Sequence, residues 1–153
     1  MKALVASTAA AVVGVLAPTA GADAVYHTDH LALSAVGGTP LRSGFVQNIK
    51  ANGPQIYAHE LFVLNGAAPR ADYNVTRNFF FFDTECGGEP DFRSSVGQLE
   101  TNHAGNARQD VFVRPDEIPA FLVGDDPHGV RWTVTDRAGK LAYQTACAAV
   151  TLD

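Results

Sequence analysis

Basic residues are few in this chain and never form a cluster. Its 153 residues contain 11 Lys and Arg against 16 Asp and Glu, which gives a formal net charge of −5. A protein that binds nucleic acid concentrates lysine and arginine on one surface to meet the phosphate backbone. The composition therefore predicts no nucleic-acid partner, and it disfavours binding to anionic membranes for the same reason.

The motifs of the common enzyme families are also missing. The sequence has no GxSxG, HExxH, Walker or Rossmann glycine pattern. His59 and Glu60 suggest an acid–base pair, but neighbouring residues of a strand point to opposite faces, so we expect a surface pair with no joint role. The chain is predicted not to be an enzyme and to use no cofactor.

Long apolar segments are confined to the start of the chain. Lys2 precedes a run of small and apolar residues at 3–17, which is shorter than the roughly 20 residues of a membrane span. The triplet at 22–24, Ala-Asp-Ala, supplies the small residues that a signal peptidase needs. Residues 1–24 are predicted to be a signal peptide, and residues 25–153 a single secreted domain with no membrane association after cleavage.

Cysteine is scarce, since the chain contains only Cys86 and Cys147. In an exported chain an even number of cysteines predicts a disulfide, and two allow one intramolecular pairing. The bridge would close a loop of about 60 residues, worth about 4 kcal/mol by the chain-entropy model. A free reactive thiol is disfavoured because neither cysteine lies in a CxxC motif.

Helical periodicity is nearly absent as well. Short runs rich in Val, Thr, Phe, Tyr and Leu alternate with turn residues, which predicts an all-β, antiparallel two-sheet sandwich of about seven or eight strands. The one helical candidate is Pro115–Phe121, and Trp132 is the expected centre of the core. The strands are predicted at 30–36, 45–49, 56–64, 73–82, 95–101, 110–114, 130–136 and 141–152.

Four consecutive phenylalanines end the most regular of these strands. Alternation places Phe79 and Phe81 on the face that carries Tyr73, where they would fill the core. Phe80 and Phe82 lie on the other face. They are either covered by the N-terminal arm, by a neighbouring loop or through a bulge, or they form a contact face for a partner or a second copy.

Two segments resemble parts of known exported proteins. The segment LNGAAPRADYNV at 64–75 places a proline four residues before Tyr73, and this resembles the tyrosine corner of immunoglobulin-like and fibronectin type III sandwiches, in which the tyrosine hydroxyl bonds to upstream backbone. TNHAGNA at 101–107, followed by VFV at 111–113, is similar to a loop and strand of exported bacterial sandwich domains. As a whole the chain resembles small secreted proteins of high-GC Gram-positive bacteria with no assigned activity. That resemblance implies an immunoglobulin-like fold and secretion, and no catalytic residues.

One metal site can be inferred at the predicted mature N-terminus. If cleavage follows Ala24, the amine of Val25, two backbone amides and His27 can surround Cu(II) or Ni(II) in square-planar geometry, with His30 near enough to contribute. The acidic residues around Cys86 lack the regular spacing of a calcium loop, so we expect them to form solvated turns. These acidic residues are Asp83, Glu85, Glu89 and Asp91.

Three functions therefore stay open. The first is a non-enzymatic extracellular binding module, monomeric or weakly dimeric, which contacts an unknown protein or surface ligand through Phe80 and Phe82 or through loops near Cys86. The second is a secreted protease inhibitor with Gly87–Arg93 as its reactive loop. The third is a copper-binding protein, or an enzyme, built on the histidines.

Overall fold

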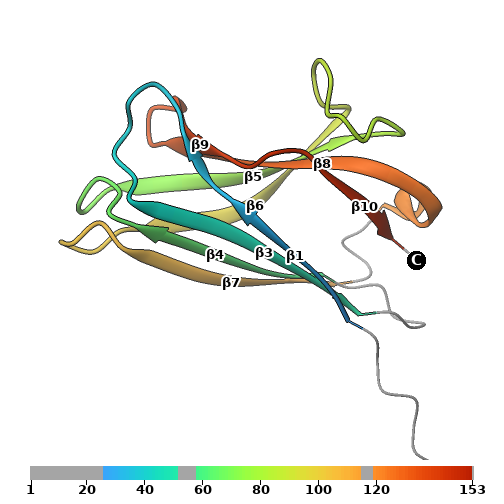
Figure 1. Ribbon diagram of the computed structural model, residues 1–153, viewed down its shortest axis with the longest axis horizontal. Coiled ribbons are helices and arrows are strands. Elements are labelled where there is room, and N and C mark those ends of the chain that lie inside the picture. The colour runs from blue at the N-terminus through green and yellow to red at the C-terminus, as the bar shows by residue number, and fades with distance from the viewer. Residues whose placement is uncertain (1–25, 52–57, 115–118, 153) are drawn as a thin grey trace, which may run out of the picture.

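The chain is a two-layer β-sandwich, as the sequence predicts. The computed structural model describes residues 26–51, 58–114 and 119–152. Within these ranges ten strands form two antiparallel sheets that pack face to face (Figure 1). The predicted signal peptide at 1–24 lies outside the described residues.

The two sheets differ in size. The first has four strands in the order β1-β3-β4-β7, and the second follows the path β2-β9-β8-β5-β6 with β10 also paired to β8. The connections from β4 to β5, from β6 to β7 and from β7 to β8 all pass from one sheet to the other. The elements are β1 Tyr26–Ala32, β2 Ser34–Ala35, β3 Ser43–Ala51, β4 Ala58–Asn65, β5 Asp72–Phe80, β6 Phe92–Glu100, β7 Ala107–Val113, the 3-10 turn η2 Ala120–Leu122, β8 Gly124–Asp136, β9 Leu141–Gln144 and β10 Ala148–Leu152.

Two of the predicted strands are each divided into two. The segment predicted at 30–36 belongs to β1 in the first sheet and to β2 in the second, because the chain changes sheet at the buried Leu33. The segment predicted at 141–152 is interrupted between β9 and β10, which pair with successive parts of the long strand β8. The predicted helix at 115–121 is described only in its last part, where η2 forms a single turn.

The core lies between the sheets and follows the predicted alternation. Tyr73, Val75 and Phe79 on β5 point inward, and Trp132 on the neighbouring strand β8 is almost completely buried beside them. Trp132, Tyr143 and Phe62 are the largest of the fully buried side chains. Burying such large apolar side chains removes the most surface from water, so this layer supplies most of the hydrophobic stabilisation.

A charged pair crosses the core and joins the sheets. The Nε and Nη2 atoms of Arg77, on β5, each donate a hydrogen bond of 2.7 Å to the carboxylate of Glu60, on β4. Trp132 Nε1 donates to the same carboxylate at 3.1 Å. Glu60 is 1% exposed, so the expectation that it belongs to a surface pair is wrong. The carboxylate tolerates burial because the bidentate guanidinium and the indole N–H satisfy its charge and its lone pairs.

Two tyrosine hydroxyls form a second link inside the sandwich. The hydroxyl of Tyr73 lies 3.0 Å from that of Tyr143, which donates to the carbonyl oxygen of Pro40 at 2.9 Å. Burial, together with the bond to Tyr73, raises the pKa of Tyr143. The tyrosine-corner resemblance predicted a bond from Tyr73 to upstream backbone, whereas its hydroxyl partner here is another side chain. The pair ties β5 and β9 to the connection before β3.

Removing the cation from the buried pair tests this description of the core. Arg77→Met leaves the Glu60 carboxylate buried without a countercharge, so we expect a loss of about 3–5 kcal/mol in the free energy of unfolding. The combined variant Glu60→Gln with Arg77→Met removes both charges and keeps an acceptor for Trp132 Nε1, so most of the loss should be recovered. Urea denaturation of the three proteins measures both effects. If Arg77→Met were as stable as the wild type, Arg77 would not be the countercharge that stabilises the buried Glu60 carboxylate.

Candidate functional site

The four phenylalanines do not all belong to one strand. Strand β5 ends at Phe80, and Phe81 and Phe82 form a turn. Phe82 has a φ of 58°, which is rare for a bulky residue and costs conformational energy. The two-residue alternation therefore stops at Phe80. Phe81 packs partly buried at the edge of the core, while Phe82 is 71% exposed.

Phe80 is 3% exposed, so the prediction that it forms part of a contact face is wrong. The neighbouring loop covers it, which is one of the alternatives that the sequence left open. Gly129 lies opposite Phe80 on β8, and a side chain there would collide with the carbonyl oxygen of Asp83. The missing side chain lets the loop lie directly on the sheet. The guanidinium of Arg131 covers the Phe80 ring at 5.6 Å, and its Nη2 donates to the Cys86 carbonyl at 3.5 Å.

The predicted disulfide between Cys86 and Cys147 is confirmed. It joins the loop after β5 to the short segment between β9 and β10, with 5.7 Å between the two Cα atoms. Cys86 is buried. The Asp83 carboxylate braces the same loop by accepting the backbone N–H groups of Glu85 at 3.0 Å and Gly87 at 2.7 Å. The loop is therefore fixed to the sheet both by a covalent bond and by its own turn hydrogen bonds.

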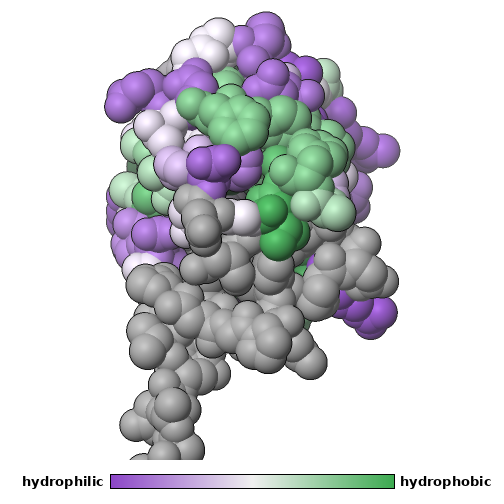
Figure 2. Space-filling model, turned by 90° about the vertical axis from the view of Figure 1, so that its right-hand side faces the viewer, coloured by the Kyte–Doolittle hydropathy of each residue, from purple (hydrophilic) through white to green (hydrophobic). Residues whose placement is uncertain are grey.

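A series of ring contacts covers the end of the sandwich at which the loop after β5 lies. Phe121, from η2, meets Phe81 edge-on with 5.2 Å between ring centroids. His128, on β8, lies 6.0 Å from Phe81 and 5.2 Å from Phe82. Phe121 is 65% exposed, and Val123 beside it is also exposed. We call Phe81, Phe82, Phe121, Val123 and His128 the aromatic end; Figure 2 shows apolar side chains gathered on this end of the molecule.

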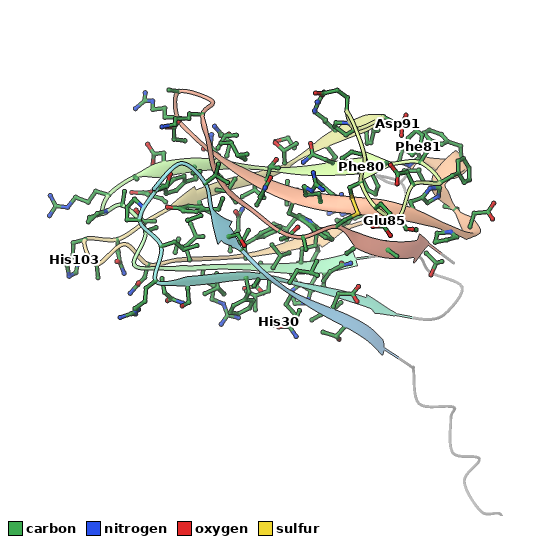
Figure 3. All side chains as sticks on the ribbon, turned by 45° about the horizontal axis from the view of Figure 1, so that its top comes forward. His30, Phe80, Phe81, Glu85, Asp91 and His103 are labelled. Carbon is green, nitrogen blue, oxygen red and sulfur yellow. A yellow bond between two sulfur atoms is a disulfide. The ribbon has the colours of Figure 1, made fainter. Side chains whose placement is uncertain are left out.

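Exposed carboxylates lie near the aromatic end. The Asp91 carboxylate accepts the backbone N–H of Phe81 at 2.7 Å, and Figure 3 shows Asp91 and Glu85 at the same end of the molecule as Phe81. Glu85 and Asp126 are exposed. Glu89 differs from these, because it forms a 2.6 Å ion pair with Arg93. The exposed apolar surface is therefore bordered by negative charge.

The metal site predicted at the N-terminus is not assembled by the described residues. Val25 lies outside them, and so does the side chain of His27. His30 is exposed on the first sheet, where its ring stacks on Phe45 at 4.4 Å. In the described part of the chain, no group of three or more His, Cys, Asp and Glu side chains is arranged to hold a metal ion.

The other histidines are separated in the fold. His59 lies on the first sheet, with its Nε2 atom 3.0 Å from the Asp110 carboxylate. His128 belongs to the aromatic end, while His103 lies at the opposite end of the sandwich (Figure 3). Among the described residues, these side chains therefore build no joint catalytic centre.

No protein family model, no curated protein and no solved structure matches this chain. In the described ranges, no helix has the length and apolar character needed to cross a membrane. The choice of the aromatic end as the candidate site therefore depends only on the contacts and exposure of residues in this chain.

Sequence reasoning did not connect the phenylalanine run with Phe121, Val123 and His128. These residues lie about 40 positions further along the chain, beyond the range of any local period. The available signal was the run of apolar residues at 120–123, which has no alternating pattern of its own.

Removing the disulfide tests whether it holds the loop in place. For Cys86→Ser with Cys147→Ser we expect the free energy of unfolding to fall by about 4 kcal/mol, from the entropy of the longer open chain. The loop should also become a site of limited proteolysis, which mass spectrometry locates. If the double variant resists both urea and protease as well as the oxidised wild type does, the disulfide does not anchor this loop.

Proposed function

We propose that this protein is a secreted, non-enzymatic binding module and that the aromatic end is its contact site. The observation that carries the proposal is the exposure of Phe82, Phe121 and Val123 on one surface, joined through ring contacts with Phe81 and His128. Adjacent exposed aromatic side chains are typical of protein interfaces. Export is supported by the signal-like segment at 1–24 and by the disulfide, which persists in oxidising compartments.

The conformation of Phe82 supports the same proposal. A phenylalanine at positive φ costs energy, and folded proteins keep such residues where the surrounding structure enforces them, often at functional sites. The ring remains 71% exposed, so its contact with His128 recovers little apolar burial within the chain. A partner that covers the ring would recover the rest of that burial.

The charges around the site indicate the chemistry of the partner. Asp91 lies against the backbone of Phe81, and Glu85 and Asp126 are exposed nearby. Carboxylates steer positively charged partners toward a surface, and aromatic faces attract cations. We therefore propose a protein segment that presents an apolar side chain next to lysine or arginine.

Truncating two exposed rings tests the contact site. A random peptide library selected on the wild type should yield basic, apolar-rich sequences. Phe82→Ser with Phe121→Ser should weaken their binding at least about tenfold, because central aromatic anchors dominate interface energy. Isothermal calorimetry measures the affinity, and circular dichroism should show an unchanged fold.

Phe112→Ser is the matched control, since Phe112 is 65% exposed, like Phe121, but lies on β7. If the double variant, the control and the wild type bound the selected peptides with equal affinity, the aromatic end would not be the contact site.

Protease inhibition is a second candidate, supported by the loop Gly87–Arg93. Gly87, Gly88 and Glu89 are exposed, and the disulfide at Cys86 braces the start of the loop. Inhibitors of this kind present a rigid loop to the protease. A panel of serine proteases assayed with micromolar purified protein separates the two functions, because a binding module leaves every protease at full rate.

A further inference from the structure

A second apolar surface lies on the side of the first sheet that faces away from the second sheet. The strand register places Ile49, His59 and Phe112 in one row across β3, β4 and β7. Phe45 and Val63 lie in a parallel row, and Leu61 lies between the two rows. We call Phe45, Ile49, Leu61, Val63 and Phe112 the outer apolar face. His30 points away from the sandwich on the same side (Figure 3).

Strand β4 has the sequence of a strand that is covered on both faces. Phe62 and Leu64 are completely buried in the core, while Leu61 and Val63 between them point outward and are half-buried. An antiparallel sheet with one face in water normally alternates apolar and polar residues, and an uninterrupted apolar run is typical of strands covered on both sides.

The second sheet shows that the rule is followed elsewhere in this chain. On its outward face, the pairs Asn74–Thr135, Thr76–Thr133 and Asn78–Arg131 between β5 and β8 are polar. The one apolar pair of this row, Phe80 opposite Gly129, lies under the loop that follows β5. On the outer face of the first sheet, five apolar side chains lie among polar ones such as Gln47, Arg108 and Asp110. A layer that covers this face would account for the apolar side chains there.

The charges at the outer apolar face balance one another. Arg108 Nε and Asp110 Oδ2 are 3.4 Å apart, and His59 Nε2 lies 3.0 Å from Asp110 Oδ1. The hydrogen bond with His59 lowers the pKa of Asp110, so its carboxylate stays ionised near neutral pH. The His59 ring also stacks on Phe112, with 4.3 Å between centroids. A surface with balanced charge does not repel a second copy, whereas the acidic border of the aromatic end would.

The size of the face limits the strength of such a contact. Strands β3 and β4 pair over eight positions, from Ser43–Asn65 to Lys50–Ala58. At about 3.4 Å per residue and about 4.8 Å per strand, four strands cover about 500 Å² on each copy. Two copies would bury about 1,000 Å², the lower limit of a specific interface and below the usual value of about 1,600 Å².

We propose that the outer apolar face is the contact surface of a reversible homodimer, in which the four-stranded sheets of two copies pack face to face. Such sheets pack about 10 Å apart with their strands nearly aligned, so the side chains of both copies interdigitate. Leu61 lies at the centre of this contact and Phe112 near its edge. The inference does not depend on the function proposed for the aromatic end.

Sedimentation equilibrium of the oxidised protein, from about 1 µM to about 1 mM, tests the dimer. The wild type should change from monomer to dimer within this range. Leu61→Lys places a charge at the centre of the contact, so its dissociation constant should rise at least about tenfold. Thr135→Lys adds the same charge to the outward face of the other sheet and should dimerise like the wild type. A wild type that stays monomeric throughout, or a Leu61→Lys protein with an unchanged dissociation constant, would overturn the proposal.

A second variant keeps the test decisive if Leu61→Lys does not fold. Phe112 is 65% exposed, so Phe112→Lys should preserve the monomer and weaken the same dimer. Phe82→Ser changes only the aromatic end and should leave the dimer intact. If Phe82→Ser abolishes dimerisation while Phe112→Lys does not, the contact lies at the aromatic end and the proposed interface is wrong.

Discussion

The loop that follows β5 lies directly on β8 because Gly129 carries no side chain. This close approach has three consequences at once. It buries Phe80 beneath the loop, it positions Cys86 for its bond to Cys147, and it turns the chain so that Phe82 points outward. The aromatic end exists because these three effects act on one short segment. A larger residue at 129 would lift the loop and disperse the site.

The rest of the sandwich holds this loop on a rigid frame. Glu60 and Arg77 connect the sheets through two charged hydrogen bonds, and the hydroxyls of Tyr73 and Tyr143 connect β5 to β9. Burying a charge is unfavourable, and it is offset here because both oxygens of the Glu60 carboxylate accept directed hydrogen bonds. Such partners fix the position of β5, the strand from which the loop departs. Binding loops on rigid scaffolds need less ordering when a partner arrives.

Alternation along a strand predicted the core well and the site less well. Tyr73 and Phe79 were placed correctly because a period of two decides which residues share a face. The rule also placed Phe80 on the outward face correctly, but no local period decides whether a loop or a partner covers that ring. It stops applying at Phe81 and Phe82, because the strand ends at Phe80. Glu60 was misplaced because Leu61, Phe62 and Val63 follow it, and an apolar run on both faces hides which face is the core. The disulfide could be predicted without knowledge of the fold, because two cysteines allow a single intramolecular pairing.

The central claim is that an anchored loop buries Phe80 and exposes Phe82. Solution NMR with a soluble paramagnetic agent measures this directly through the relaxation of the phenylalanine ring protons. The account predicts strong enhancement for Phe82 and Phe121, little for Phe80 in the oxidised protein, and a rise for Phe80 after the disulfide is reduced. Equal enhancement of Phe80 and Phe82 in the oxidised protein would contradict it.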